Sequence, residues 1–147
     1  MEKGYYIGID SGTHTGLAIW DGARRMFTCI ETVPMHRALF RVRDLAKMAE
    51  DQGRSLTVVF EDARARKWFP KEMSNSEYRG KLMGAGSVKR DSKIWEEFLK
   101  DYHIKFENVP PRKGLTKLDP DYFARLTGFT GRTSEHSRDA AMLVFQR

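Results

Sequence analysis

Residues 5–20 read YYIGIDSGTHTGLAIW, and this stretch decides the class of fold. A short run rich in tyrosine and isoleucine ends at Asp10, and a turn containing glycine leads into a second apolar run, Leu17 to Trp20. Two such runs around a turn are typical of a β-hairpin. A third strand is expected from about residue 25 to 32, because apolar and polar side chains alternate there. Its predicted faces are Met26, Thr28 and Ile30 on one side and Phe27, Cys29 and Glu31 on the other.

The rest of the chain alternates between helix and strand patterns. The run LTVVFE at 56–61 is almost wholly apolar, which indicates a central strand buried on both faces, and residues 104–109 predict a fifth strand. Four helices are expected: one from Pro34 to just before Gly53, a long one from Ser74 to about Tyr102, a short one from Pro120 to about Leu126, and one capped by Ser134 that reaches the C-terminus. This order predicts an α/β fold with a mixed five-stranded sheet between helices, three antiparallel strands followed by parallel ones.

Length and composition restrict the class of protein. With 147 residues, 40% of them hydrophobic, we expect a single domain over 1–147. No apolar run approaches the roughly 20 residues of a membrane span. The lone cysteine, Cys29, cannot form an intramolecular disulfide, and the first residues show no secretion signal, so a cytoplasmic location is expected.

Positive charge is concentrated in one segment. The formal net charge is +6, and residues 64–93 contain nine basic and three acidic residues, so this segment alone accounts for the excess. It also contains Trp68, Phe69 and Tyr78. Basic side chains interleaved with aromatic ones suit a polyanion with stackable bases, so nucleic acid is the expected partner. The alternative is an ordinary solvated helix face.

Acidic side chains mark the ends of two predicted strands. Asp10 ends the first strand and Glu61 ends the central one, so the two would meet at one sheet edge if these strands are parallel neighbours. His136 and Asp139 lie three residues apart on the last predicted helix, hence on one face of it. Grouped carboxylates favour hard ions such as Mg²⁺ or Mn²⁺, and a pair of such ions can activate water for phosphodiester hydrolysis. Taken singly, an acid at a strand end such as Asp10 or Glu61 is more often an ordinary turn or cap residue. Asp139 fits that explanation less well, because it directly precedes the apolar run Ala140 to Phe145, where an unpaired charge would be costly.

Four motifs follow one another along the chain: IGIDSGTHTGLAIW at 7–20, VVFEDAR at 58–64, GAGSVKRDSKIWEEFL at 84–99 and EHSRDAAMLV at 135–144. In their order and spacing they resemble the RuvC-like Holliday junction resolvases of the ribonuclease H-like superfamily, especially its small phage-encoded members. The resemblance covers nearly the whole chain. It implies a ribonuclease H-like fold and a metal-dependent, structure-selective endodeoxyribonuclease that cuts branched DNA, such as four-way junctions, flaps or forks, in a bacterial cell or a phage-infected host.

The resemblance also implies roles for single residues. The family's metal site takes one carboxylate from each of two strand ends and a pair of ligands from the last helix, to hold two Mg²⁺ or Mn²⁺ ions. Here these ligands are Asp10, Glu61, His136 and Asp139. His136 would either ligate metal or transfer protons, and Glu135 would replace it as ligand if the helix register differs. A lysine of the loop before the last helices, Lys113 or Lys117, is expected at the scissile phosphate.

Members of this family act as homodimers, with the long middle helix at or near the interface. Gly80, Gly84 and Gly86 would allow close approach of helices there, or else mark a break in the helix. The DNA-facing candidates share the basic segment: Arg66, Lys67, Trp68, Phe69, Lys89, Arg90 and Lys93. The aromatic pair within this set would either stack at the junction centre or be buried.

Two other classes of function match parts of the sequence. The turn from Ile9 to Thr13, with Gly16, is similar to the first phosphate-binding turn of actin-like and sugar-kinase ATPases. Those proteins close two such domains around a nucleotide, and this chain has length for one. The other alternative is a non-catalytic nucleic-acid-binding module whose acids are structural.

Overall fold

The computed structural model describes residues 3–62, 75–110 and 117–147, with the backbone alone over 75–85 and at 88. Within these ranges the elements are, in chain order, β1 (Tyr5–Asp10), β2 (His14–Asp21), β3 (Met26–Pro34), α1 (Met35–Asp51), β4 (Leu56–Glu61), α2 (Asn75–Asp101), β5 (Lys105–Val109), α3 (Pro120–Thr127) and α4 (Glu135–Met142). This order confirms the predicted succession of strands and helices.

The five strands form one mixed sheet in the order β3-β2-β1-β4-β5. The first three strands pair antiparallel, β1 with β2 and β2 with β3, whereas β4 pairs parallel with both β1 and β5. The predicted sheet is therefore confirmed, and β1 and β4 are the parallel neighbours that the candidate site requires.

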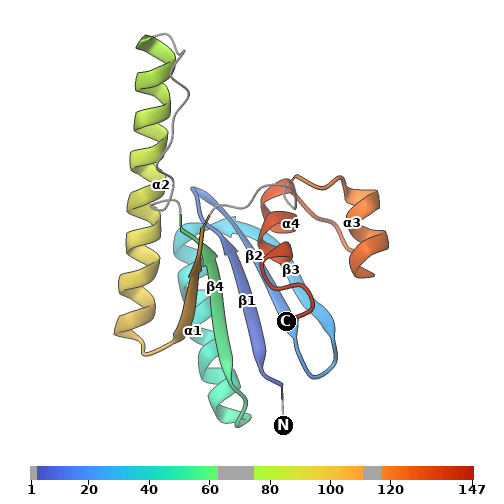
Figure 1. Cartoon of the computed structure of the whole chain (residues 1–147). Helices are drawn as coiled ribbons and strands as arrows, with labels where there is room; N and C mark the ends of the chain where they lie inside the picture. The colour runs from blue at the N-terminus through green and yellow to red at the C-terminus, as the bar shows by residue number, and fades with distance from the viewer. Residues whose placement is uncertain (1–2, 63–74, 111–116) are drawn as a thin grey trace.

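Helices cover both faces of the sheet (Figure 1). On one face, the alternate side chains of β1 and β4 pack against α1 and the C-terminal half of α2, with Trp95 and Leu99 fully buried. On the other face, α4 lies across β1 and β2, and α3 adds Phe123 to the same cluster. The long helix α2 extends well beyond the sheet (Figure 1).

The predicted alternation of the third strand is wrong in one respect. Ile19 pairs with Cys29 but the next residue, Trp20, pairs with Phe27, so Thr28 is an extra residue in a β-bulge. Phe27 and Ile30 consequently share the face covered by α4, although they were expected on opposite faces. A bulge shifts the register by one residue, and a simple alternation pattern does not record it.

Helix ends follow the local capping signals with one exception, the end of the last helix. Asp119 caps α3 by accepting a hydrogen bond from the Tyr122 amide at 2.8 Å, as its position before a proline predicts. The last helix ends at Met142 instead of continuing to the C-terminus. The backbone of α2 runs without a break through its three glycines, and Gly86 is exposed. No helix in the described part of the chain is long and apolar enough to cross a membrane.

Candidate functional site

Two acidic residues stand at the carboxyl ends of adjacent parallel strands. Ile9 of β1 pairs with Phe60 of β4, so Asp10 and Glu61 follow at the same level. Val59 packs in the cluster beneath α4, and the two-residue alternation of a strand places Glu61 on that same face. Asp10 faces α4 as well, as its hydrogen bond described below shows. The edge predicted for the site is therefore the edge that α4 covers.

Two glycines let the backbone of α4 rest directly on the sheet. A Cβ atom on Gly16 would lie 2.1 Å from the carbonyl oxygen of His136, and one on Gly8 would lie 2.0 Å from that of Ala140. Neither position has room for any side chain. Because Gly16 is the β2 partner of Asp10, the close approach at Gly16 brings the first turn of α4 next to Asp10.

The first turn of α4 is held in place by its cap. The Ser134 hydroxyl accepts a hydrogen bond from the Ser137 amide at 3.2 Å, and the Ser137 hydroxyl accepts one from the Ser134 amide at 2.8 Å, which forms a capping box. The Ser134 hydroxyl also bonds to the hydroxyl of Thr32 on β3. With the helix anchored at this end, Nδ1 of His136 lies 2.9 Å from Oδ2 of Asp10.

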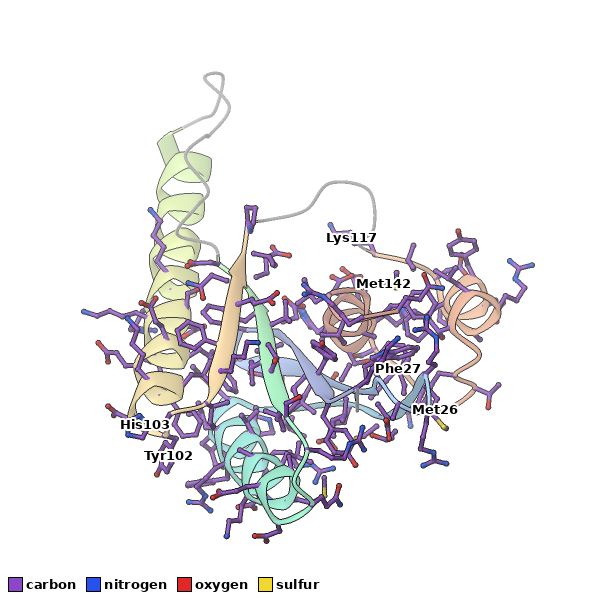
Figure 2. The ribbon with its side chains drawn as sticks, turned by 60° about the horizontal axis from the view of Figure 1, so that its bottom comes forward. Met26, Phe27, Tyr102, His103, Lys117 and Met142 are labelled. Atoms are coloured by element: carbon purple, nitrogen blue, oxygen red, sulfur yellow. The ribbon has the colours of Figure 1, made fainter. Side chains whose placement is uncertain are left out.

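Asp139, one turn further along α4, binds the segment that precedes α3. Its Oδ1 accepts a hydrogen bond of 2.8 Å from the backbone amide of Lys117. Figure 2 shows Lys117 close to α4, on the stretch of chain that leads into α3. Its side chain is exposed and its backbone has a φ of 60°, in the left-handed region. The other lysine expected at the phosphate, Lys113, lies outside the described residues.

Burial is the main reason that the pKa of Asp10 is raised above its ordinary value. The hydrogen bond and charge of His136 oppose this shift, and the negative charges of Asp139 and Glu135 add to it. His136, Asp139 and Glu135 therefore lie close enough to Asp10 to influence its carboxyl group. An added cation would relieve both the burial cost and the repulsion.

The donor atoms of the site are of the kind that a hard divalent ion prefers. Within the described ranges, no group of three or more His, Cys, Asp and Glu side chains is arranged to hold a metal. One oxygen of Asp10 bonds to His136 and one oxygen of Asp139 bonds to Lys117, so these two hydrogen bonds engage a single oxygen of each carboxylate. Carboxylate oxygens are the ligands that Mg²⁺ and Mn²⁺ prefer. The expected ligands therefore have the atom types that these ions require, and their joint coordination of an ion stays a prediction.

Part of the predicted DNA-facing set lies on α2. Lys89, Arg90 and Lys93 are exposed there, whereas Asp91 and Ser92 are buried. The remaining candidates lie outside the described residues: Arg66, Lys67, Trp68 and Phe69. These three cations lie on the exposed side of α2, where Lys93 also approaches Glu97 at 3.9 Å.

Sequence reasoning overlooked two residues that shape the site. Gly8 carried a usable signal, because a glycine inside an apolar strand often marks the close approach of another backbone. Arg138 carried none. The residue is 9% exposed, and its Nε donates a 2.7 Å hydrogen bond to the carbonyl oxygen of Leu118.

Comparison with known proteins rests on structure. No family model matches the chain, and no curated protein sequence does. The solved structure of Thermus thermophilus RuvC is similar, with a TM-score of 0.51 and 13% sequence identity over 97% of this chain and 92% of that one. The chain has the ribonuclease H-like fold of RuvC. The similarity to RuvC confirms the fold class predicted from the sequence; at this identity it shows the fold alone.

Proposed function

We propose that this protein is a divalent-metal-dependent endonuclease that cuts branched DNA in the manner of Holliday junction resolvases. The supporting observation is an interaction between two residues 126 positions apart, the 2.9 Å hydrogen bond between Asp10 and His136. It forms at the carboxyl end of β1, next to the end of β4, on a sheet with the RuvC fold. Asp139 is near enough to raise the pKa of Asp10.

In this proposal the ions are held by the strand-end carboxylates Asp10 and Glu61 together with Asp139. Two Mg²⁺ or Mn²⁺ ions bound there would supply an activated water and neutralise charge on the phosphate. His136 has one ring nitrogen directed at Asp10, and its side chain is 57% exposed. The other ring nitrogen is thereby available either to ligate metal or to accept a proton from the attacking water.

The proposed substrate is a polyanion, so the exposed cations of α2 would bind DNA phosphates while the acids act on one of them. Lys117 would bind the phosphate next to the acidic site, because its backbone bonds to Asp139 and its side chain is exposed. Lys113 is the alternative at that position. A homodimer would place two such sites on opposed strands of a four-way junction.

Cleavage of a synthetic four-way junction tests the proposal, with Mg²⁺, with Mn²⁺ and with EDTA. We expect Asp10→Asn, Glu61→Gln and Asp139→Asn to abolish cutting and to leave junction binding nearly unchanged, because other residues bind the phosphates. Asp44→Asn is the matched control. Asp44 is an exposed carboxylate on α1, which covers the opposite face of the sheet, so cleavage should be unaffected.

The alternative function, a binding module without catalysis, predicts a different result. Such a protein would bind the junction equally well in EDTA and would cut it with neither ion. Undiminished cutting by Asp10→Asn would remove the metal site from the proposal. A parallel panel of flaps and forks would identify the preferred branched substrate.

A further inference from the structure

Arg138 is a charged residue that α4 turns inward. Only 9% of it is exposed, and burying a guanidinium is costly unless its donors are bonded. Nε donates to the carbonyl oxygen of Leu118 at 2.7 Å, and Nη1 donates to the hydroxyl of Thr133 at 3.0 Å. Leu118 directly precedes the cap of α3, and Thr133 directly precedes the cap of α4.

The next residue of α4 binds the segment that precedes α3. Asp139 accepts a hydrogen bond from the amide of Lys117, the residue before Leu118. Consecutive helix residues project about 100° apart, so Arg138 and Asp139 reach the segment from different directions. Two consecutive side chains of α4 therefore bind the backbone of two consecutive residues, the carbonyl of Leu118 and the amide of Lys117.

The segment needs such support at this point. Lys117 has a φ of 60°, a left-handed conformation that is unfavourable for a residue with a side chain. The two hydrogen bonds to α4 offset this cost and determine where the Lys117 amide points. That amide in turn engages Oδ1 of Asp139, which orients the carboxylate and its second oxygen.

We infer that Arg138 is a positioning residue for the acidic site: by binding the carbonyl of Leu118 it holds the Lys117 amide where it can orient Asp139. The consequence for metal binding rests on the function proposed above, but the hydrogen bonds that link Arg138 to Asp139 do not. Arginine suits this role because its planar fork reaches two acceptors at once, which the single ammonium of lysine does not reproduce.

The test compares Arg138→Met with Arg54→Met in the full-length protein. Arg54 is the matched control: its side chain is 11% exposed and it too donates to a backbone carbonyl, that of Lys3 at 2.8 Å, but it lies at the other end of the sheet and pairs with Asp21. Two quantities are measured for each variant: Mn²⁺ affinity by titration calorimetry, and hydrogen exchange of the Lys117 amide by NMR.

We expect Arg138→Met to weaken Mn²⁺ binding about tenfold, the usual scale for losing a group that orients a ligand. We also expect its Lys117 amide to exchange faster, while Arg54→Met changes neither quantity. Thr133→Val removes one acceptor of Arg138 and leaves the arginine in place. It should shift both quantities in the same direction by a smaller amount, and it serves if Arg138→Met does not fold.

Wild-type Mn²⁺ affinity together with unchanged Lys117 exchange in Arg138→Met, or in Thr133→Val if that variant alone folds, would overturn the inference. If the wild-type protein binds no Mn²⁺ at all, the proposed nuclease function fails. The exchange of the Lys117 amide would still decide whether Arg138 positions Asp139, so the two failures are distinguishable.

Discussion

The close packing at Gly16 makes a single methyl group a sharp test of how the site is assembled. In Gly16→Ala the new Cβ would lie 2.1 Å from the carbonyl oxygen of His136 and 2.9 Å from the amide nitrogen of Ser137. Protein carbon atoms rarely approach such atoms within about 3 Å, so the first turn of α4 must move away by about 1 Å. The obstructing atoms are backbone, so rotating a side chain does not relieve the overlap.

This displacement has two measurable consequences. Overpacking of this kind costs about 1–3 kcal/mol of folding free energy, and each kcal/mol lowers Tm by roughly 2–4 °C in a domain of this size. A misplacement of about 1 Å at a catalytic group costs on the order of 100-fold in rate. Because His136 carries the obstructing carbonyl, its hydrogen bond to Asp10 should break first. We expect junction cleavage to fall further than the loss of folded protein explains.

Calorimetric melting and single-turnover cleavage of a four-way junction, both on purified protein, measure the two effects. Gly86→Ala is the matched control, since Gly86 lies on an exposed part of α2 and, among the described residues, the added Cβ meets nothing within 4 Å beyond its chain neighbours and the backbone of its own helix. The same substitution there should stabilise the protein by about 0.5–1 kcal/mol, which gives the effect of the added methyl group on Tm without the overlap. A Gly16→Ala protein with wild-type Tm and cleavage rate would refute the argument that α4 rests on this glycine.

Three further predictions concern other parts of the molecule. Arg54 holds the pKa of Asp21 below its usual value, so the stability that this pair adds is present at neutral pH and is lost as the pH falls through the lowered pKa. In urea unfolding at pH 7, we expect Asp21→Asn to be about 3 kcal/mol less stable than wild type. This difference in unfolding free energy should shrink below about pH 4. Charge reversal of Lys89 and Arg90 should weaken junction binding and lower the salt dependence of log Kd by about one for each phosphate that is no longer neutralised; an unchanged slope would exclude them from the interface. His136→Asp should raise Mg²⁺-supported cleavage relative to Mn²⁺-supported cleavage, because a carboxylate is the harder ligand, whereas loss with both ions would assign His136 to proton transfer.

Local signals predicted most of the secondary structure. The cap at Asp119 and the strand LTVVFE both depend on residues that are close in sequence, so a single short stretch is enough to predict them. The bulge at Thr28 was missed because it depends on how β3 matches β2, which is a property of two strands. The continuous backbone of α2 through Gly80, Gly84 and Gly86 shows that glycines at about 1 kcal/mol each do not interrupt a helix of 27 residues.

The sequence by itself determined the order of the elements and indicated Asp10, Glu61, His136 and Asp139, because strand ends and helix spacing follow from the periodicity of side chains along the chain. Only the tertiary structure decided how α4 sits against the sheet. The interactions that seat it involve backbone atoms and distant partners: the bare backbone at Gly8 and Gly16, and the carbonyl of Leu118. Backbone atoms are the same at nearly every position, so no local sequence pattern predicts which residue they will contact. Those contacts are fixed only when the chain has folded.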